Sequence, residues 1–145
     1  LIAFRRDRAE TLLPMTRSVE LAEKQLRDLP TGGRTPLAEG LAHALKTVRE
    51  LARRGAEKTV LILITDGRTN VARDGDDGVQ RALRAAEEIA GTQALTLVLD
   101  TERAVPRVGI APEIARRMGA HYYTLEQLTA EGVLEIVRTS RSMQR

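Results

Sequence analysis

The sequence predicts an α/β domain in which a doubly wound, mostly parallel sheet is flanked by helices. Two observations lead to this fold class. Short apolar runs alternate along the 145 residues with segments whose apolar side chains recur at helical spacing, and the connections are short. The run at 58–65 is nearly continuously apolar and too short for most helices, which is typical of a strand buried on both faces of a parallel sheet.

The first part of the chain is predicted to hold two strands and a helix. Residues 1–4 form a short apolar strand, and residues 10–15 form an edge strand, because Pro14 cannot donate to a ladder. A helix of about ten residues follows, with Ser18 as its N-cap and Pro30 as its stop.

A longer helix precedes the run at 58–65. Thr35 is expected to cap it, Pro36 suits its first position, and Gly55 can end it. Its apolar face is formed by Leu37, Leu41, Leu45, Val48 and Leu51. The polar segment 74–78 is expected to be a loop that caps a third helix, whose inward face holds Val79, Leu83, Ala86 and Ala90.

The last elements are shorter. Residues 95–99 form another apolar strand, and a short helix over 112–118 is closed by Gly119. A strand at 121–124 and a last helix at roughly 129–140 complete the pattern. No internal linker or repeat is visible, so we expect residues 1–145 to form one domain.

Composition excludes several classes of function. There is no Cys, which excludes disulfides, zinc-thiolate sites and thiol nucleophiles. The net charge of +3 arises from interspersed acidic and basic residues, and there are only one Phe and two Tyr, so nucleic-acid binding is not expected. No apolar run approaches the roughly 18 residues of a membrane span, and no signal peptide is visible. We therefore expect a cytoplasmic protein.

Common catalytic and nucleotide motifs are also absent. The glycine-containing loop near residue 32 lacks the lysine of a P-loop, so no nucleotide is expected to bind. There is no G-x-S-x-G elbow and no H-E-x-x-H pair. The sequence indicates no catalytic residue.

Oxygen-bearing side chains instead follow the predicted strands. Asp66 ends the strand at 58–65, and Asp100, Thr101 and Glu102 end the strand at 95–99. Thr35 opens a helix at the same edge. The carboxyl ends of parallel strands form the edge where α/β sheets bind ligands, and such oxygens suit Mg²⁺. From spacing alone, Thr35 as a simple N-cap and Asp66 with its glycine as a simple turn are favoured over a metal site.

The sequence resembles the von Willebrand factor A, or integrin I-like, domain. More narrowly, it is similar to the C-terminal domain of this type in magnesium chelatase D subunits. The sharpest match is P-T-G-G-R-T-P-L at 30–37. Further matching residues lie at 1–4, 12–19, 63–71, 99–102 and 119–123.

This resemblance implies a metal-ion-dependent adhesion site that binds Mg²⁺ or Mn²⁺. Thr35 and Asp66 match two of its ligands, whereas the D-x-S-x-S loop that supplies the others has no match. Arg34, Gly67, Asp100 and Glu102 are expected at the rim or in contact with a partner.

The resemblance also implies that a strand is absent. In the family's sheet order, 3-2-1-4-5-6, the first strand and its metal loop are central, and neither is found in this sequence. We therefore expect the chain to be a fragment of a longer protein, or another element to fill the vacant place.

In the chelatase that the sequence resembles, the D subunit is not the catalyst. It couples the ATPase subunits to the porphyrin-binding subunit when Mg²⁺ is inserted into protoporphyrin IX for chlorophyll biosynthesis in photosynthetic organisms. The resemblance thus implies a non-catalytic, metal-dependent protein-interaction module with these two subunits as partners. The alternatives are an A-type domain of a cobalt-chelatase-like or other ATPase-linked complex, and a domain that binds partners without metal.

Overall fold

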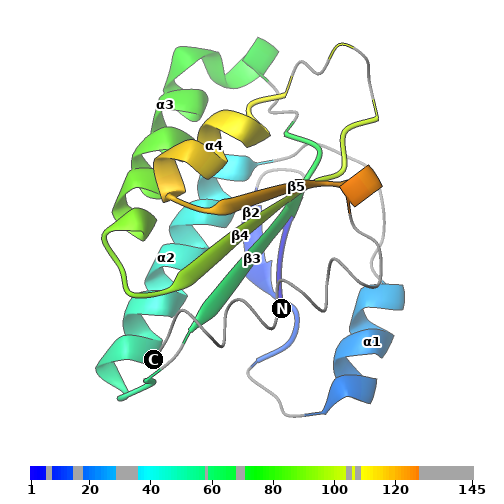
Figure 1. Cartoon of the computed structure of the whole chain (residues 1–145), viewed down its shortest axis with the longest axis vertical. Helices are drawn as coiled ribbons and strands as arrows, with labels where there is room; N and C mark the ends of the chain where they lie inside the picture. Colours follow the sequence, from blue (N-terminus) through cyan, green and yellow to red (C-terminus); the bar gives the residue numbers. More distant parts are fainter. Residues whose placement is uncertain are drawn as a thin grey trace.

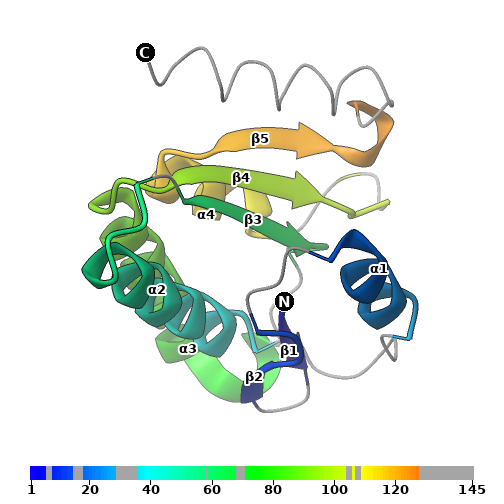
Figure 2. The same cartoon turned by 90° about the horizontal axis from the view of Figure 1, so that it is seen from below.

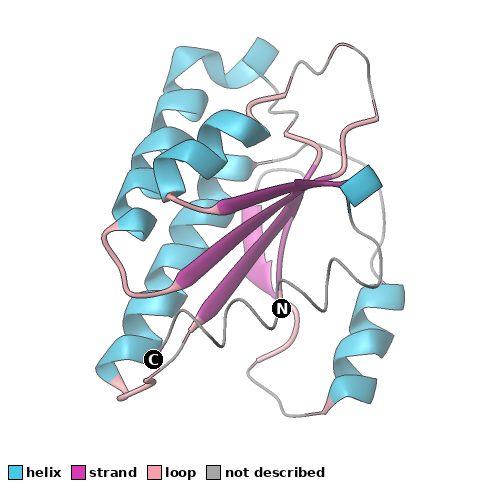
Figure 3. Ribbon diagram, viewed as in Figure 1, coloured by secondary structure: helices cyan, strands magenta, loops and turns pink. Residues whose placement is uncertain are grey.

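Three parallel strands form the sheet in the computed structural model, which describes residues 1–5, 8–14, 18–28, 36–57, 59–67, 71–103, 106 and 109–127. Their order is β3 (Val60–Thr65), β4 (Leu95–Asp100), β5 (His121–Thr124). The register pairs Leu63 with Val98 and Val98 with Tyr122. Helices flank this sheet (Figures 1 and 3), which confirms the predicted fold class.

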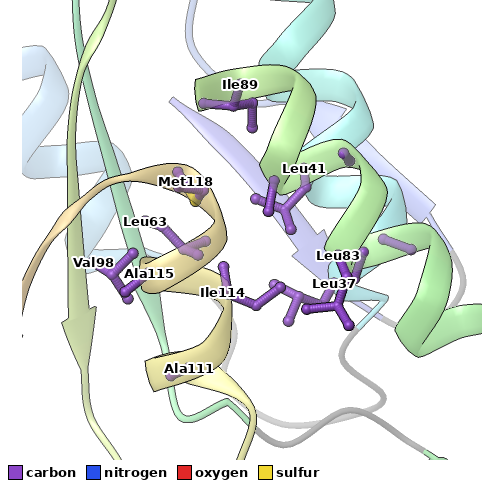
Figure 4. Packing of buried hydrophobic residues seen from close by; sticks show 14 of the residues in the cluster. Leu37, Leu41, Leu63, Leu83, Ile89, Val98, Ala111, Ile114, Ala115 and Met118 are labelled. Carbon is purple, nitrogen blue, oxygen red and sulfur yellow. The ribbon is translucent and has the colours of Figure 1, made fainter. Parts of the chain in front are cut away.

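Three helices pack together beside the sheet, on the left of the strands in Figure 1. They are α2 (Leu37–Arg53), α3 (Val71–Ala90) and α4 (Ala111–Met118). Their apolar faces and the inward residues of β3 and β4 form one aliphatic core (Figure 4), which includes Leu37, Leu41, Leu63, Leu83, Ile89, Val98, Ile114 and Met118. Ion pairs between Arg81 and Glu39 and between Arg49 and Glu88 join α2 to α3 at the surface.

A separate antiparallel hairpin lies beyond β3 (Figure 2). It consists of β1 (Ile2–Arg5) and β2 (Arg8–Thr11). The second strand therefore lies earlier than the predicted 10–15. The hairpin packs on α2, where Thr11 Oγ1 lies 2.9 Å from His43 Nε2.

Local signals were correct at the start of α1 and the end of α4, whereas Pro36, expected at the first position of α2, is the N-cap residue before Leu37. Helix α1 (Val19–Arg27) stands apart from the other helices in Figure 1, and Ser18 caps it by accepting a hydrogen bond from the Leu21 N–H at 3.1 Å. Gly119 ends α4 in the left-handed conformation, with φ of 61°, as expected. A short 3₁₀ turn, η1 (Leu125–Gln127), follows β5.

One predicted loop is wrong. Residues 74–78 lie inside α3, which begins at Val71, so the Asp and Gly residues there do not interrupt the helix. The helix predicted at roughly 129–140 lies outside the described residues.

Candidate functional site at the carboxyl edge of the sheet

The carboxyl ends of the three strands bring several polar residues into one row. Thr65 pairs with Asp100, and Asp100 pairs with Thr124. The Thr101 N–H donates to the Thr65 carbonyl at 2.9 Å, which holds the segment after β4 against the end of β3. Asp66 is the first residue beyond β3 and is half-buried. The structure thus places Asp66 at the edge that the sequence predicted.

The backbone around Asp66 is held on both sides by glycines. Gly67 has φ of +65°, and its N–H donates to Thr65 Oγ1 at 3.0 Å. Its carbonyl accepts a hydrogen bond from the Ile110 N–H at 2.9 Å. A Cβ at Gly67 would lie 2.7 Å from the Ala111 nitrogen, and one at Gly109 would lie 2.7 Å from the Asp66 carbonyl oxygen. The segment leading into α4 therefore packs so closely on the Asp66 corner that both positions require glycine.

Two carboxylates lie beneath this edge. Asp100 is 1% exposed and Glu102 is 3% exposed. Asp100 accepts the Glu102 N–H at 2.9 Å and the Tyr122 hydroxyl at 2.5 Å, one on each oxygen. Glu102 accepts the Gly109 N–H at 3.0 Å. Because a buried carboxylate is costly unless it is hydrogen-bonded, these contacts explain how the two acids are accommodated.

This burial changes how Asp100 and Glu102 are understood. The sequence placed them at the rim or in contact with a partner, whereas their side chains face protein donors below the surface. They join the ends of β4 and β5 to the segment that leads into α4. Their contribution at this edge is to position the backbone around Asp66. Gly67 is buried as well.

The chemistry of Asp66 fits one ligand of a hard cation, since Mg²⁺ prefers carboxylate oxygens. Within the described part of the chain, no group of three His, Cys, Asp or Glu side chains could hold a metal ion. Thr35 and Arg34 lie outside the described residues, so the convergence of Thr35 and Asp66 on one ion stays a prediction. Of the two predicted ligands, the described residues include Asp66, whose carboxylate is the right type of oxygen ligand.

Sequence reasoning missed two residues of this edge. Tyr122 reaches Asp100 because β5 pairs with β4 in register, and no local sequence motif predicts that contact. Gly109 carries a weak signal, because a glycine shortly before a helix often marks a close backbone approach.

A further finding concerns membranes: none of the helices described here is both long enough and apolar enough to span a bilayer.

Comparison with known proteins places the chain among relatives of two kinds. It is 40% identical over 141 residues to the uncharacterized protein MJ0910 of Methanocaldococcus jannaschii, and the match covers 96% of this chain and 80% of that protein. It is 38% identical to the magnesium-chelatase 67 kDa subunit of Heliobacterium mobile and 35% identical to the 60 kDa subunit of Rhodobacter capsulatus. Those matches cover 96% and 94% of this chain.

The two kinds of relative differ in how much of their length is matched. The chain spans 22% of the Heliobacterium subunit and 25% of the Rhodobacter subunit, at their C-terminal ends. No family model and no solved structure matches the chain. Because it covers most of MJ0910 at this level of identity, the chain belongs to the family of that protein, and it is homologous to the C-terminal part of magnesium-chelatase subunits.

Proposed function

We propose that this domain is a metal-dependent protein-interaction module of a magnesium-chelatase-type complex in the cytoplasm. The observation that supports it is homology over nearly the whole chain to the C-terminal part of subunits named magnesium-chelatase in several bacteria. In this proposal the module links the ATPase subunit to the porphyrin-binding subunit during insertion of magnesium into protoporphyrin IX. In this proposal the domain itself does not catalyse the insertion.

Asp66 and Thr35 are the residues proposed to hold the cation. Asp66 fits this role because it is half-buried at the carboxyl edge and its backbone is fixed by Gly67 and Gly109. A fixed backbone lowers the conformational entropy lost when a side chain binds an ion. When bound, Mg²⁺ supplies an open position for an acidic side chain of the partner.

The first experiment measures metal binding. Calorimetric titration of Mg²⁺ and of Mn²⁺ into the purified protein is expected to show saturable heat. Asp66→Asn is expected to weaken the affinity at least about tenfold, which corresponds to about 1.4 kcal/mol. Asp28→Asn is the matched control, because Asp28 is an exposed aspartate in the turn after α1. Absence of heat with the wild-type protein would count against binding of a divalent cation by this domain.

The second experiment measures partner binding. The ATPase and porphyrin-binding chelatase subunits of the same organism are tested for association with the protein, with Mg²⁺ and with EDTA. Association that requires Mg²⁺ and is lost in Asp66→Asn supports the proposed metal-dependent interaction. Association that is equal with EDTA and unaffected by the substitution supports metal-free binding instead. Failure of both subunits to associate contradicts the proposed complex.

A second candidate function follows from the first relative. MJ0910 is matched over 80% of its length, at higher identity than the chelatase subunits reported above, and it is uncharacterized. An A-type domain of another ATPase-linked assembly, such as a cobalt-chelatase-like complex, is therefore the alternative. Genes for a corrin pathway next to this gene favour the alternative, whereas a gene for a porphyrin-binding chelatase subunit favours the first proposal.

A further inference from the structure

Thr65 is the last residue of β3, and its side chain lies on the inner face of the sheet. Side chains of a strand alternate between the two faces, so Thr65 shares its face with Leu61 and Leu63. Leu63 belongs to the aliphatic core drawn in Figure 4, and Thr65 is only 6% exposed. The strand therefore ends with a hydroxyl at a position where its neighbours on the same face are apolar.

The buried hydroxyl of Thr65 needs an explanation. Valine has a similar β-branched shape and also favours strands, so it would fill this place without a polar atom. A hydroxyl that is buried without a hydrogen bond is unfavourable. In the structure, Thr65 Oγ1 accepts a hydrogen bond from the Gly67 N–H at 3.0 Å. A valine could not accept this bond.

Thr65 is itself fixed by the sheet. It pairs with Asp100 of β4, and its carbonyl accepts a hydrogen bond from the Thr101 N–H at 2.9 Å. These contacts come from β4 and not from the segment that follows Asp66. The Thr65 hydroxyl is therefore a fixed acceptor for the residues that leave the strand.

Gly67 is held between this acceptor and the segment that leads into α4. Its N–H donates to Thr65, and its carbonyl accepts the Ile110 N–H at 2.9 Å. Asp66 is the single residue between Thr65 and Gly67, so its backbone is fixed on both sides. A site built on a fixed backbone loses less conformational freedom when it binds a ligand.

We propose that Thr65 is a positioning residue of the Asp66 site: its buried hydroxyl holds the Gly67 N–H and thereby fixes the backbone from which Asp66 binds a cation. This inference rests on the proposed function, because the cation is part of that proposal. Thr65 is not a ligand here and acts through the backbone of Asp66 and Gly67. Its hydroxyl, and not its β-branched shape, carries the role.

Hydrogen exchange of the Gly67 amide tests this role without any cation. Thr65→Val keeps the shape of the side chain and removes the acceptor. The Gly67 amide is then expected to exchange at least about tenfold faster, measured relative to the Leu63 amide of the same protein. Thr65→Ser keeps a hydroxyl and is expected to stay within about threefold of the wild type. Equal Gly67 exchange in wild type and Thr65→Val overturns the proposal.

Thr96→Val is the matched control. Thr96 is another buried threonine of the sheet, 5% exposed, and its Oγ1 donates to the Met118 carbonyl at 3.4 Å. It lies near the start of β4, at the opposite end of the sheet from Asp66. Its replacement is expected to leave Gly67 exchange within about twofold of the wild type. Equal acceleration in Thr65→Val and Thr96→Val would indicate general loosening and overturns a specific role of Thr65.

Titration of Mg²⁺ into the protein expressed at its natural length tests the effect on the cation. Thr65→Val is expected to weaken the affinity at least about tenfold, whereas Thr65→Ser and Thr96→Val stay within about threefold of the wild type. A purely structural Thr65 would lower stability and leave the Mg²⁺ affinity of the folded protein unchanged. That result overturns the positioning role.

The two experiments separate this inference from the proposed function. If the wild type binds no Mg²⁺, the proposed function fails, and Gly67 exchange alone decides whether Thr65 holds the Asp66 backbone. If wild type and Thr65→Val bind Mg²⁺ equally well, the proposed function stands and the positioning role fails. If Thr65→Val does not fold, Thr65→Ala and Thr65→Ser provide the same comparison, because only the serine keeps the acceptor.

Discussion

Phe4 and Gly40 are in direct contact, and this contact attaches the N-terminal hairpin to the helical layer. A Cβ at Gly40 would lie 2.6 Å from Phe4 Cγ and 2.7 Å from Cδ1, distances that real Cβ atoms do not adopt. Gly40 lies inside α2, where glycine is normally unfavourable. The helix therefore accepts a poor helix former because the Phe4 ring needs the space.

Gly40→Ala is expected to destabilise the protein. The substitution gains about 1 kcal/mol of helix propensity. Overpacking against Phe4 costs about 1–3 kcal/mol, so the free energy of unfolding is expected to fall by up to about 2 kcal/mol. Denaturant unfolding measures the change.

A double-mutant cycle provides the control for Gly40→Ala. Phe4→Ala removes the two nearest ring atoms but keeps Cβ, 3.0 Å from the new Cβ. In that background the cost of Gly40→Ala is therefore expected to be smaller than in the wild type, because most of the overpacking is removed while the gain in helix propensity remains. An identical cost of Gly40→Ala in both backgrounds would show that Phe4 is not the cause.

Tyr122→Phe is expected to lower the free energy of unfolding by about 1.5–3 kcal/mol, because the buried Asp100 carboxylate loses a donor. Tyr123→Phe is the matched control. Tyr123 is the adjacent residue of β5, and its hydroxyl has no hydrogen bond to the described residues, so a change within about 0.5 kcal/mol is expected. Thermal and denaturant unfolding compare the two variants. Equal effects would mean that the Asp100 contact contributes little.

The sequence predicted the elements that depend on local signals. The apolar runs of β3 and β4 identify two parallel strands, and Gly119 marks the end of α4 because its backbone is left-handed. The expectation that β3 is buried on both faces is wrong, because Val60, Ile62 and Ile64 are 51%, 52% and 54% exposed. Ser18 caps α1 as its residue type suggests. The position of Asp66 followed from the strand alone, since the residue after a parallel strand must lie at the carboxyl edge.

Features that depend on distant contacts were not predictable. The strand expected at 10–15 is found at Arg8–Thr11. Its position is set by pairing with β1 and not by its own apolar content. The segment 74–78 is helical although its Asp and Gly residues favour a loop. Asp100 and Glu102 look like exposed acids in the sequence, and only the contacts with Tyr122 and Gly109 explain their burial.

Acid titration of Glu113 is expected to reveal a strongly perturbed group. Hydrogen bonds from the Arg116 and Arg117 side chains lower the pKa of Glu113 from 4.5 to about 2. A lowered pKa in the folded state contributes stability that is fully present above pH 4.5 and is lost as the pH falls through about 2. NMR titration of the Glu113 carboxyl group measures the value directly.

The matched comparison for Glu113 is a pair of variants. The difference in unfolding temperature between wild type and Glu113→Gln is expected to be constant above pH 5 or so and to shrink toward pH 2, because the unfolded carboxylate protonates first. Glu57→Gln is the control, since Glu57 is exposed and the structure describes no ion pair for it. A Glu113 pKa at its ordinary value would mean that the arginines do not hold the carboxylate in solution.

Gly109→Ala tests whether the segment before α4 positions Asp66. The new Cβ would lie 2.7 Å from the Asp66 carbonyl oxygen and 2.8 Å from the Gly67 carbonyl carbon, and both are backbone atoms that cannot rotate away. We expect a loss of about 1–3 kcal/mol in the free energy of unfolding, the usual cost of overpacking. If Asp66 holds a cation, the Mg²⁺ affinity falls as well, because its backbone must move.

Gly91→Ala separates this steric effect from the general effect of replacing a glycine. Its Cβ would meet nothing closer than 3.4 Å, an ordinary contact, and Gly91 lies just after α3, far from the Asp66 corner in the chain. Stability is expected to change by less than about 0.5 kcal/mol and Mg²⁺ affinity not at all. If Gly109→Ala leaves stability unchanged but weakens Mg²⁺ binding, the backbone around Asp66 can shift without loss of folding stability, and its position affects only the affinity for the ion. Loss of stability with unchanged Mg²⁺ affinity would instead show that the position of the Asp66 backbone does not affect metal binding.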